Sequence, residues 1–145
     1  MNKSEQAKKT FLSGFNCAQS VQSSFSEELG LDRDLALKLS YGFGGGMGKL
    51  QETCGAVTGA FMALGLKHGM TEVDPEVKEA NYAKVKEFTQ RFEEIHGSIK
   101  CIDLVETDLN TKEGAAYFKE NDLLNEVCAK CVGDAVRIVE EMLGK

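Results

Sequence analysis

Residues 122–143 read DLLNEVCAKCVGDAVRIVEEML, and this stretch decides the fold class. Its apolar residues recur at intervals of four, three, four, three and four, the spacing of one face of an α-helix. They are Leu124, Cys128, Cys131, Ala135, Ile138 and Met142. No stretch of useful length in the chain alternates apolar and polar residues as a half-buried strand would. We therefore expect one continuous amphipathic helix over residues 122–143, and an all-α protein.

Helical signals continue through the rest of the 145-residue chain. Asp74 and Pro75 begin a second long helix, because proline is favoured at the first helical position, and Gly97 ends it. Its apolar face contains Val85, Phe88, Phe92 and Ile95. Shorter helices are predicted at about residues 4–12, 17–29, 32–41, 54–67, 98–106 and 111–119. Their expected N-caps include Ser4, Asn16, Asp32 or Asp34, Thr53 and Ser98, and Asn16 forms a capping box with Gln19. The prediction is a single compact all-α domain over residues 1–145, with about six to eight helices and a Gly-rich loop.

Charge and hydropathy disfavour several classes of protein. Lys and Arg number 17 and Asp and Glu 23, which gives a net charge of −6 without a basic stripe, so we expect no nucleic-acid partner. The longest mostly apolar stretch, residues 56–66, is shorter than the roughly 20 residues of a membrane span, so no membrane insertion is expected. The N-terminal lysines precede no apolar segment, so we predict no secretory signal and a cytoplasmic protein. In that reducing compartment, five cysteines favour metal binding or thiol chemistry.

Three of the five cysteines fall at predicted helix starts. Cys17 and Cys54 are expected at the first helical position and Cys101 at the third. Free backbone N–H groups and the positive end of the helix dipole stabilise a thiolate there and lower its pKa. Cys131 lies on the apolar face of the last helix, where a small hydrophobic residue is the ordinary explanation. Its CxxC spacing with Cys128 is explained by core packing about as well as by redox chemistry.

Residues 42–48 read GFGGGMG and predict a loop. A Walker A motif would need glycine in place of Phe43 and serine or threonine in place of Leu50, so phosphate binding is disfavoured. The loop leads towards the next helix, where its backbone N–H groups can face an anion or a sulfur. The four-residue spacing of Gly55 and Gly59 in that helix indicates close packing, of another helix or of a bound group. The candidate cofactor-binding positions are Gly44, Gly45, Gly46, Gly55 and Gly59.

Several of these strings occur together in a known family. GFNCAQ at residues 14–19, the GFGGGMG loop, CGAVTG at residues 54–59 and the isolated Cys101 and Cys131 resemble the C_GCAxxG_C_C family, small prokaryotic proteins described as redox-active. The resemblance covers about residues 5 to 140. It implies that the four characteristic cysteines are Cys17, Cys54, Cys101 and Cys131, and it offers no counterpart for Cys128. A related domain occurs in split-Soret-type cytochromes, where an iron–sulfur centre is associated with it.

Three hypotheses follow for the cysteines. In the first, Cys17, Cys54, Cys101 and Cys131 hold a [2Fe–2S] cluster or another metal ion as four thiolates. In the second, these four act as redox thiols, with Cys54 or Cys17 attacking as a low-pKa thiolate and another cysteine resolving. In the third, the chain is a non-catalytic helical interaction module with structural cysteines.

The histidines and partners receive plainer interpretations. His68 and His96 lie at helix ends beside glycine, where a cation favoured by the helix dipole is expected rather than a metal ligand. A redox role implies a redox partner protein, whose identity the sequence does not give. The apolar face of residues 75–96 is either core or the seam of a homo-oligomer.

Overall fold

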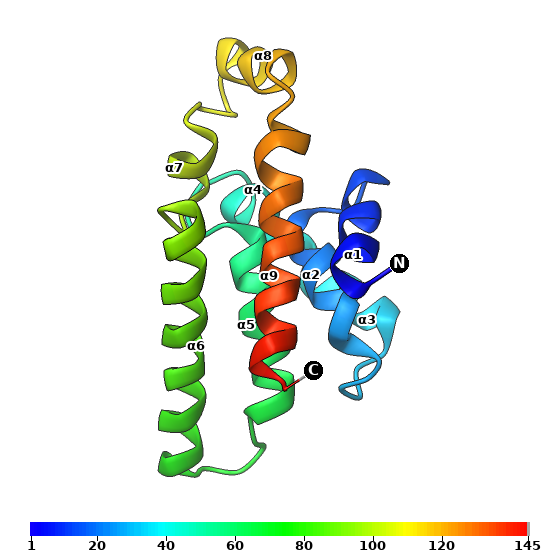
Figure 1. Cartoon of the computed structure of the whole chain (residues 1–145), viewed down its shortest axis with the longest axis vertical. Coiled ribbons are helices and arrows are strands. Elements are labelled where there is room, and N and C mark those ends of the chain that lie inside the picture. The colour runs from blue at the N-terminus through cyan, green and yellow to red at the C-terminus, as the bar shows by residue number, and fades with distance from the viewer. Residues whose placement is uncertain (145) are drawn as a thin grey trace.

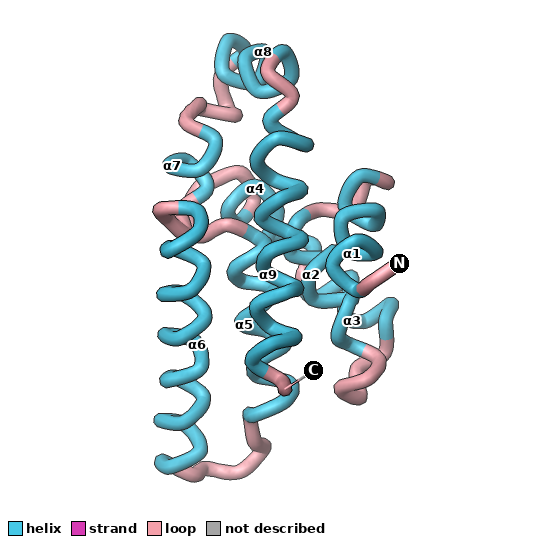
Figure 2. The backbone as a smooth tube through the Cα atoms, viewed as in Figure 1, coloured by secondary structure: helices cyan, strands magenta, loops and turns pink. Residues whose placement is uncertain are grey.

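The computed structural model describes residues 1–144 and is built from helices (Figures 1 and 2). The helices are α1 (Lys3–Leu12), α2 (Cys17–Ser26), α3 (Arg33–Leu39), α5 (Gly55–His68), α6 (Pro75–His96), α7 (Cys101–Val105), α8 (Lys112–Glu120) and α9 (Ala129–Met142), and α4 (Gly44–Met47) is a glycine turn. Residues 1–144 contain no β-strand, and an isolated antiparallel bridge pairs Thr53 with Lys100. The prediction of an all-α fold with a Gly-rich segment is confirmed, with eight helices besides α4 in the described residues.

Side chains cap most of the predicted helices. Asn16 and Gln19 form the expected capping box, in which the Gln19 amide donates to Asn16 Oδ1 at 2.9 Å and the Asn16 amide to Gln19 Oε1 at 3.0 Å. The first helix differs from the prediction, because Asn2 rather than Ser4 caps it. Ser4 lies inside α1, and its Oγ donates to the Gly133 carbonyl at 2.8 Å, which joins α1 to α9.

The three longest helices, α5, α6 and α9, pack against one another, and α1 and α2 cover the other side of α5 and α9 (Figure 1). The largest completely buried side chains include Phe25, Leu64, Phe88, Phe92 and Ile138, which come from α2, α5, α6 and α9. The apolar face of α6 therefore belongs to the protein core at Phe88 and Phe92. Short helices α7 and α8 lie at one end of the long helices (Figure 2).

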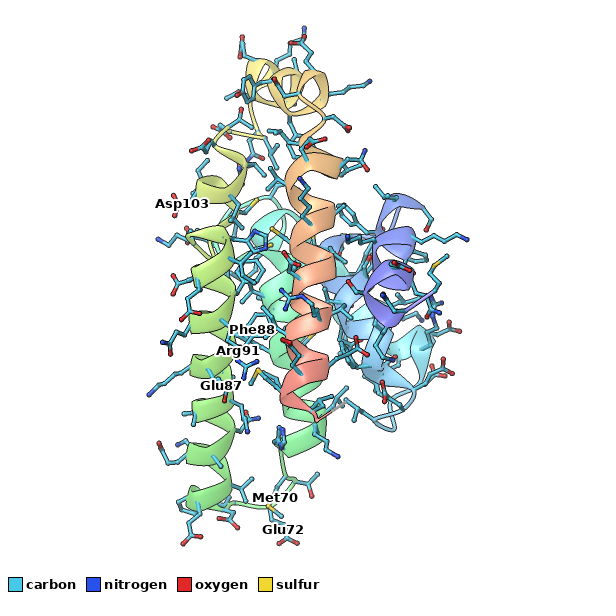
Figure 3. All side chains as sticks on the ribbon, in the orientation of Figure 1. Met70, Glu72, Glu87, Phe88, Arg91 and Asp103 are labelled. Carbon is cyan, nitrogen blue, oxygen red and sulfur yellow. The ribbon has the colours of Figure 1, made fainter. Side chains whose placement is uncertain are left out.

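An ion pair joins α6 to α9 at the surface. Arg91 Nη2 lies 2.8 Å from Glu87 Oε2 on the same helix, and its Nη1 lies 3.8 Å from Glu141 Oε1 on α9 (Figure 3). Because exposed pairs of this kind contribute about 0–1 kcal/mol each, apolar packing holds α6 in place. Among residues 1–144 no helix combines the length and the apolar content needed to cross a membrane.

The last helix is not a regular α-helix over the whole of the predicted range, residues 122–143. Leu124–Cys128 forms a π-helical turn, and the regular helix α9 begins at Ala129. A π-turn holds more residues than an α-turn, so it rotates the residues before it relative to those after it. Leu124 is accordingly 40% exposed, whereas Cys131 and Ile138 remain in the core.

The glycine-rich segment is a tight turn rather than an open loop. Gly45 and Gly46 have φ angles of 64° and 68°, in the left-handed region that glycine adopts without strain. A Cβ atom on Gly46 would lie 2.7 Å from the Cβ of Cys101 and 2.7 Å from the Cα of Gln51. Glycine here lets the start of α7 pack directly onto the turn.

Candidate functional site

A pocket of about 240 Å³ lies between the starts of α2 and α5, the glycine turn, α7 and the π-turn that precedes α9. Its lining is largely apolar and includes Phe11, Leu104 and Phe118. All the cysteines of the chain line it, namely Cys17, Cys54, Cys101, Cys128 and Cys131, and all five are unpaired thiols. The fold therefore brings together the four cysteines proposed as site residues, although long stretches of sequence separate them.

Backbone pairing holds two of these cysteines in register. The Cys54 amide donates to the Ile99 carbonyl at 2.7 Å, and the Cys101 amide donates to the Glu52 carbonyl at 2.7 Å. These bonds lie on either side of the bridge between Thr53 and Lys100. The segments before α5 and α7 are thus a short antiparallel pair, which places Cys54 and Cys101 on the same pocket.

This pairing also corrects the predicted helix starts. Cys54 is the N-cap of α5 rather than its first residue, and Cys101 is the first residue of α7 rather than the third. The reason is that Thr53 and Lys100 are engaged in the bridge, so each helix begins only after it. Ser98 caps no helix, and its hydroxyl donates to Asp103 Oδ2 at 2.9 Å. Cys17 is the first residue of α2, as predicted.

Gln51 is a residue of the site that the sequence did not single out. It is buried, its φ of 57° is in the left-handed region, and its side chain partly offsets the rise that burial causes in the pKa of Cys101. Its Nε2 donates to the Thr107 carbonyl at 2.8 Å, and its Oε1 accepts from the Leu109 amide at 2.8 Å. Since those partners are 56 and 58 positions away in the sequence, no local pattern could have indicated this role.

The surroundings of Cys54 favour its thiolate. Hydrogen bonds with the thiols of Cys131 and Cys17 lower the pKa of Cys54 well below its ordinary value of 9.0. The backbone amides of Ala56 and Val57, at the start of α5, act in the same direction, whereas burial opposes them. A helix N-terminus and two thiol donors thus converge on one sulfur.

The neighbouring thiols are held protonated. Hydrogen bonds with Cys128 and Cys54, together with burial, raise the pKa of Cys17. The hydrogen bond to Cys54 and then burial raise the pKa of Cys131. Burial raises the pKa of Cys101 to about 12. One thiolate among protonated thiols is the expected result, because like charges at short range disfavour a second ionisation.

Cys128 belongs to the same cluster, although the sequence gave it no role. It is half-buried, lines the pocket and is the main cause of the raised pKa of Cys17. The π-turn, which ends at Cys128, is part of the local geometry that places it there. The site therefore contains five thiols rather than four.

Three of the five candidate glycines line the pocket, and the other two are explained by close packing against protein atoms. Gly45, Gly46 and Gly55 line the pocket. Gly44 and Gly59 contact neighbouring protein atoms, since a Cβ on them would lie 2.7 Å from the Asn16 Cβ and 2.8 Å from the Ala18 carbonyl oxygen, respectively. Close packing thus accounts for Gly44 and Gly59.

His96 lies beside the cluster and has more specific contacts than a helix-end cation. Its Nε2 is 3.0 Å from Asp134 Oδ2, and its Nδ1 is 3.9 Å from the Cys131 sulfur. His68, at the C-terminal end of α5, has a pKa lowered by burial and by Lys84 and Lys67. Burial and neighbouring positive charges at His68 thus act against the cation that the helix dipole was expected to favour.

The donor set also bears on the metal hypothesis. Over the part of the chain that the structure describes, no three His, Cys, Asp or Glu side chains are grouped so that they could hold a metal ion.

The helices and the pocket together define a small all-helical protein with a buried thiol cluster. Residues 15–142 match the family described as "Putative redox-active protein (C_GCAxxG_C_C)". The chain belongs to this family, which confirms the resemblance inferred from the sequence and supports a redox role in general. Comparisons with curated proteins and with solved structures return no match.

Proposed function

We propose that this protein is a thiol–disulfide redox protein in which Cys54 is the attacking thiolate and Cys17 or Cys131 is the resolving thiol. The observation that carries the proposal is the position of Cys54, which is the N-cap of α5 and lines one pocket together with Cys17 and Cys131. The attacking species in disulfide exchange is the thiolate, so the cysteine with the lowered pKa is the nucleophile.

The proposed reaction has two steps. The Cys54 thiolate attacks a disulfide RSSR, forms the mixed disulfide Cys54–SR and releases one RS⁻. A neighbouring thiol then loses its proton and attacks the Cys54 sulfur, which forms an internal disulfide and releases the second RS⁻. Two protein thiols are oxidised and one external disulfide is reduced, and a dithiol from a redox partner reverses the change.

The pocket limits the substrate to a small or slender disulfide. Its volume of about 240 Å³ is below the roughly 300–1,000 Å³ of most ligand pockets, and its walls are largely apolar. Cys54 is 7% exposed and lines this pocket, so the substrate must enter the pocket to reach it.

Two measurements test the proposal. Protein purified without oxygen is first assayed for iron and acid-labile sulfide, then reduced and alkylated with limiting iodoacetamide between pH 5 and 9. We expect Cys54 to be labelled first, with half its maximal rate at a pH well below 9, because its thiolate is stabilised. Cys101 is the internal control, since its raised pKa keeps it protonated and slow over the same range.

The second measurement maps disulfides after treatment with hydroxyethyl disulfide. We expect an internal disulfide that contains Cys54, and none in Cys54→Ser, with the helical content of that variant checked by circular dichroism. Stoichiometric iron and sulfide that depend on Cys54 would overturn the proposal in favour of a cluster. Absence of any disulfide at Cys54 would overturn it in favour of structural thiols.

A further inference from the structure

We infer that His96, oriented by Asp134, is the base that removes the proton of Cys131, and that Cys131 is therefore the thiol that resolves the mixed disulfide on Cys54. This inference rests on the proposed function and adds the proton acceptor and the identity of the second cysteine. It is carried by the contacts that run from Asp134 through His96 to Cys131, and by the pocket that Cys131 and Cys54 both line.

The contact with Asp134 sets the tautomer of the imidazole. His96 Nε2 lies 3.0 Å from Asp134 Oδ2, and a carboxylate only accepts hydrogen bonds, so Nε2 carries the hydrogen. In the neutral ring the lone pair then belongs to Nδ1, which faces the Cys131 sulfur at 3.9 Å. A nitrogen with a free lone pair is the group that a thiol proton can move to.

Packing keeps the imidazole in this orientation. The ring lies against Phe92, one turn earlier on α6, with ring centroids 4.5 Å apart. Arg137 Nη2 lies 3.5 Å from the second oxygen of Asp134, so that carboxylate is held from two sides. The His96 and Asp134 side chains are 14% and 31% exposed, which gives the proton a way from the buried Cys131 towards solvent.

The order of the steps depends on which group can accept the proton of the Cys131 thiol. In the reduced protein the Cys131 thiol lowers the pKa of Cys54 and so stabilises the Cys54 thiolate. Once Cys54 is in a mixed disulfide it has no negative charge, and it is a poor acceptor. The proton then moves to His96 Nδ1, the Cys131 thiolate attacks the Cys54 sulfur, and RS⁻ leaves. Cys131 is 1% exposed, so water gives little help in taking up this proton.

The test separates the two chemical steps in the full-length reduced protein. Reaction with hydroxyethyl disulfide is quenched with acid at successive times, and mass spectrometry follows the mixed disulfide on Cys54 and the internal disulfide. In His96→Gln and Asp134→Asn we expect the mixed disulfide to form at the wild-type rate and then to accumulate. Its resolution should slow by about 100-fold in His96→Gln, the range for loss of a general base. His68→Gln is the matched control and should resolve at the wild-type rate.

Chemical rescue distinguishes a proton acceptor from a structural role. In His96→Ala, added imidazole should raise the resolution rate in proportion to its concentration, whereas a packing defect would not respond in this way. The expected product in the wild-type protein is the disulfide between Cys54 and Cys131. Mapping of the bridge to Cys17, or normal resolution in folded His96→Gln, would overturn the inference while leaving the proposed function intact. Failure to form any mixed disulfide on Cys54 would count against both, because the inference depends on that first step.

Discussion

Cys54 and Cys101 line the same pocket, yet the pKa of one is lowered and that of the other is raised. Both are 7% exposed, so burial alone cannot account for the difference. Cys54 has thiol donors and two backbone amides around its sulfur, whereas burial dominates at Cys101. At the scale of the residue, it is therefore the number of donors aimed at the sulfur that distinguishes the nucleophile from its neighbours.

Cys101 should make the folded state less stable at alkaline pH. Its pKa is about 12 in the folded protein and near its ordinary value of 9.0 in the unfolded chain. Above pH 9 the unfolded state therefore binds fewer protons at this site than the folded state does, and the free energy of unfolding falls as pH rises towards 12. We expect urea unfolding midpoints between pH 8 and 11 to fall more steeply for the wild type than for Cys101→Ser.

We compare how steeply the urea unfolding midpoint falls with pH in the wild type and in Cys101→Ser, because this comparison removes the contributions that the two proteins share. Cys17 and Cys131 also have raised pKa values and act in the same direction, and they are present in both proteins. Parallel pH dependences in the wild type and in Cys101→Ser would contradict the raised pKa of Cys101.

At the scale of the element, α5 is built for contact with α2. Gly59 lies where a Cβ would approach the Ala18 carbonyl oxygen to 2.8 Å and the Val21 Cβ to 3.1 Å. Gly65 lies six residues further along the same helix, where a Cβ would meet no atom within 4 Å. Only the first of these glycines is required by packing. It lies on α5, whose N-cap is Cys54, and against α2, which begins with Cys17.

Alanine at these two glycines should therefore have opposite effects on stability. Gly59→Ala should lower the free energy of unfolding by about 1–3 kcal/mol, because backbone rather than a mobile side chain must move. Gly65→Ala should raise it by about 0.5–1 kcal/mol, because alanine favours the helix and nothing obstructs its methyl group. Urea denaturation followed by circular dichroism measures both changes. Equal effects would show that the α2–α5 contact is looser than the structure describes.

At the scale of the whole molecule, the thiols lie where separate parts of the chain converge. Cys17 comes from α2, Cys101 from α7 and Cys131 from α9, and each is buried. Because several helices enclose the pocket that these cysteines line, we expect full exposure of the three sulfurs to require loss of packing between those helices. Access to them should follow the stability of the whole protein rather than that of one helix.

Slow labelling of the buried thiols should show whether they become exposed together, when the whole protein unfolds. With Cys54 first blocked by iodoacetamide, a second reagent at increasing urea concentrations should label Cys17, Cys101 and Cys131 with the same dependence on urea. The free energy obtained from labelling should equal the global free energy of unfolding. Labelling of Cys101 alone at low urea would show instead that the five-residue helix α7 opens by itself.

Most helices could be predicted because their signals are local. The capping box of Asn16 and Gln19, Pro75 at the start of α6 and Gly97 at its end act within a turn or two. Where the prediction was wrong by one or two residues, as at Cys54 and Cys101, a long-range bridge between Thr53 and Lys100 had intervened. The four cysteines of the family signature were identified from sequence motifs, which carry no geometry.

The sequence by itself determined the all-α fold and the family, since helix periodicity, caps and the cysteine strings are read along the chain. Only the tertiary structure decided which thiols meet, that Cys128 joins them, and that His96 and Asp134 lie beside Cys131. The physical reason is the range of the interactions. Helix formation depends on neighbours a few residues away, whereas the chemistry of a thiol depends on every group that the finished core places around its sulfur.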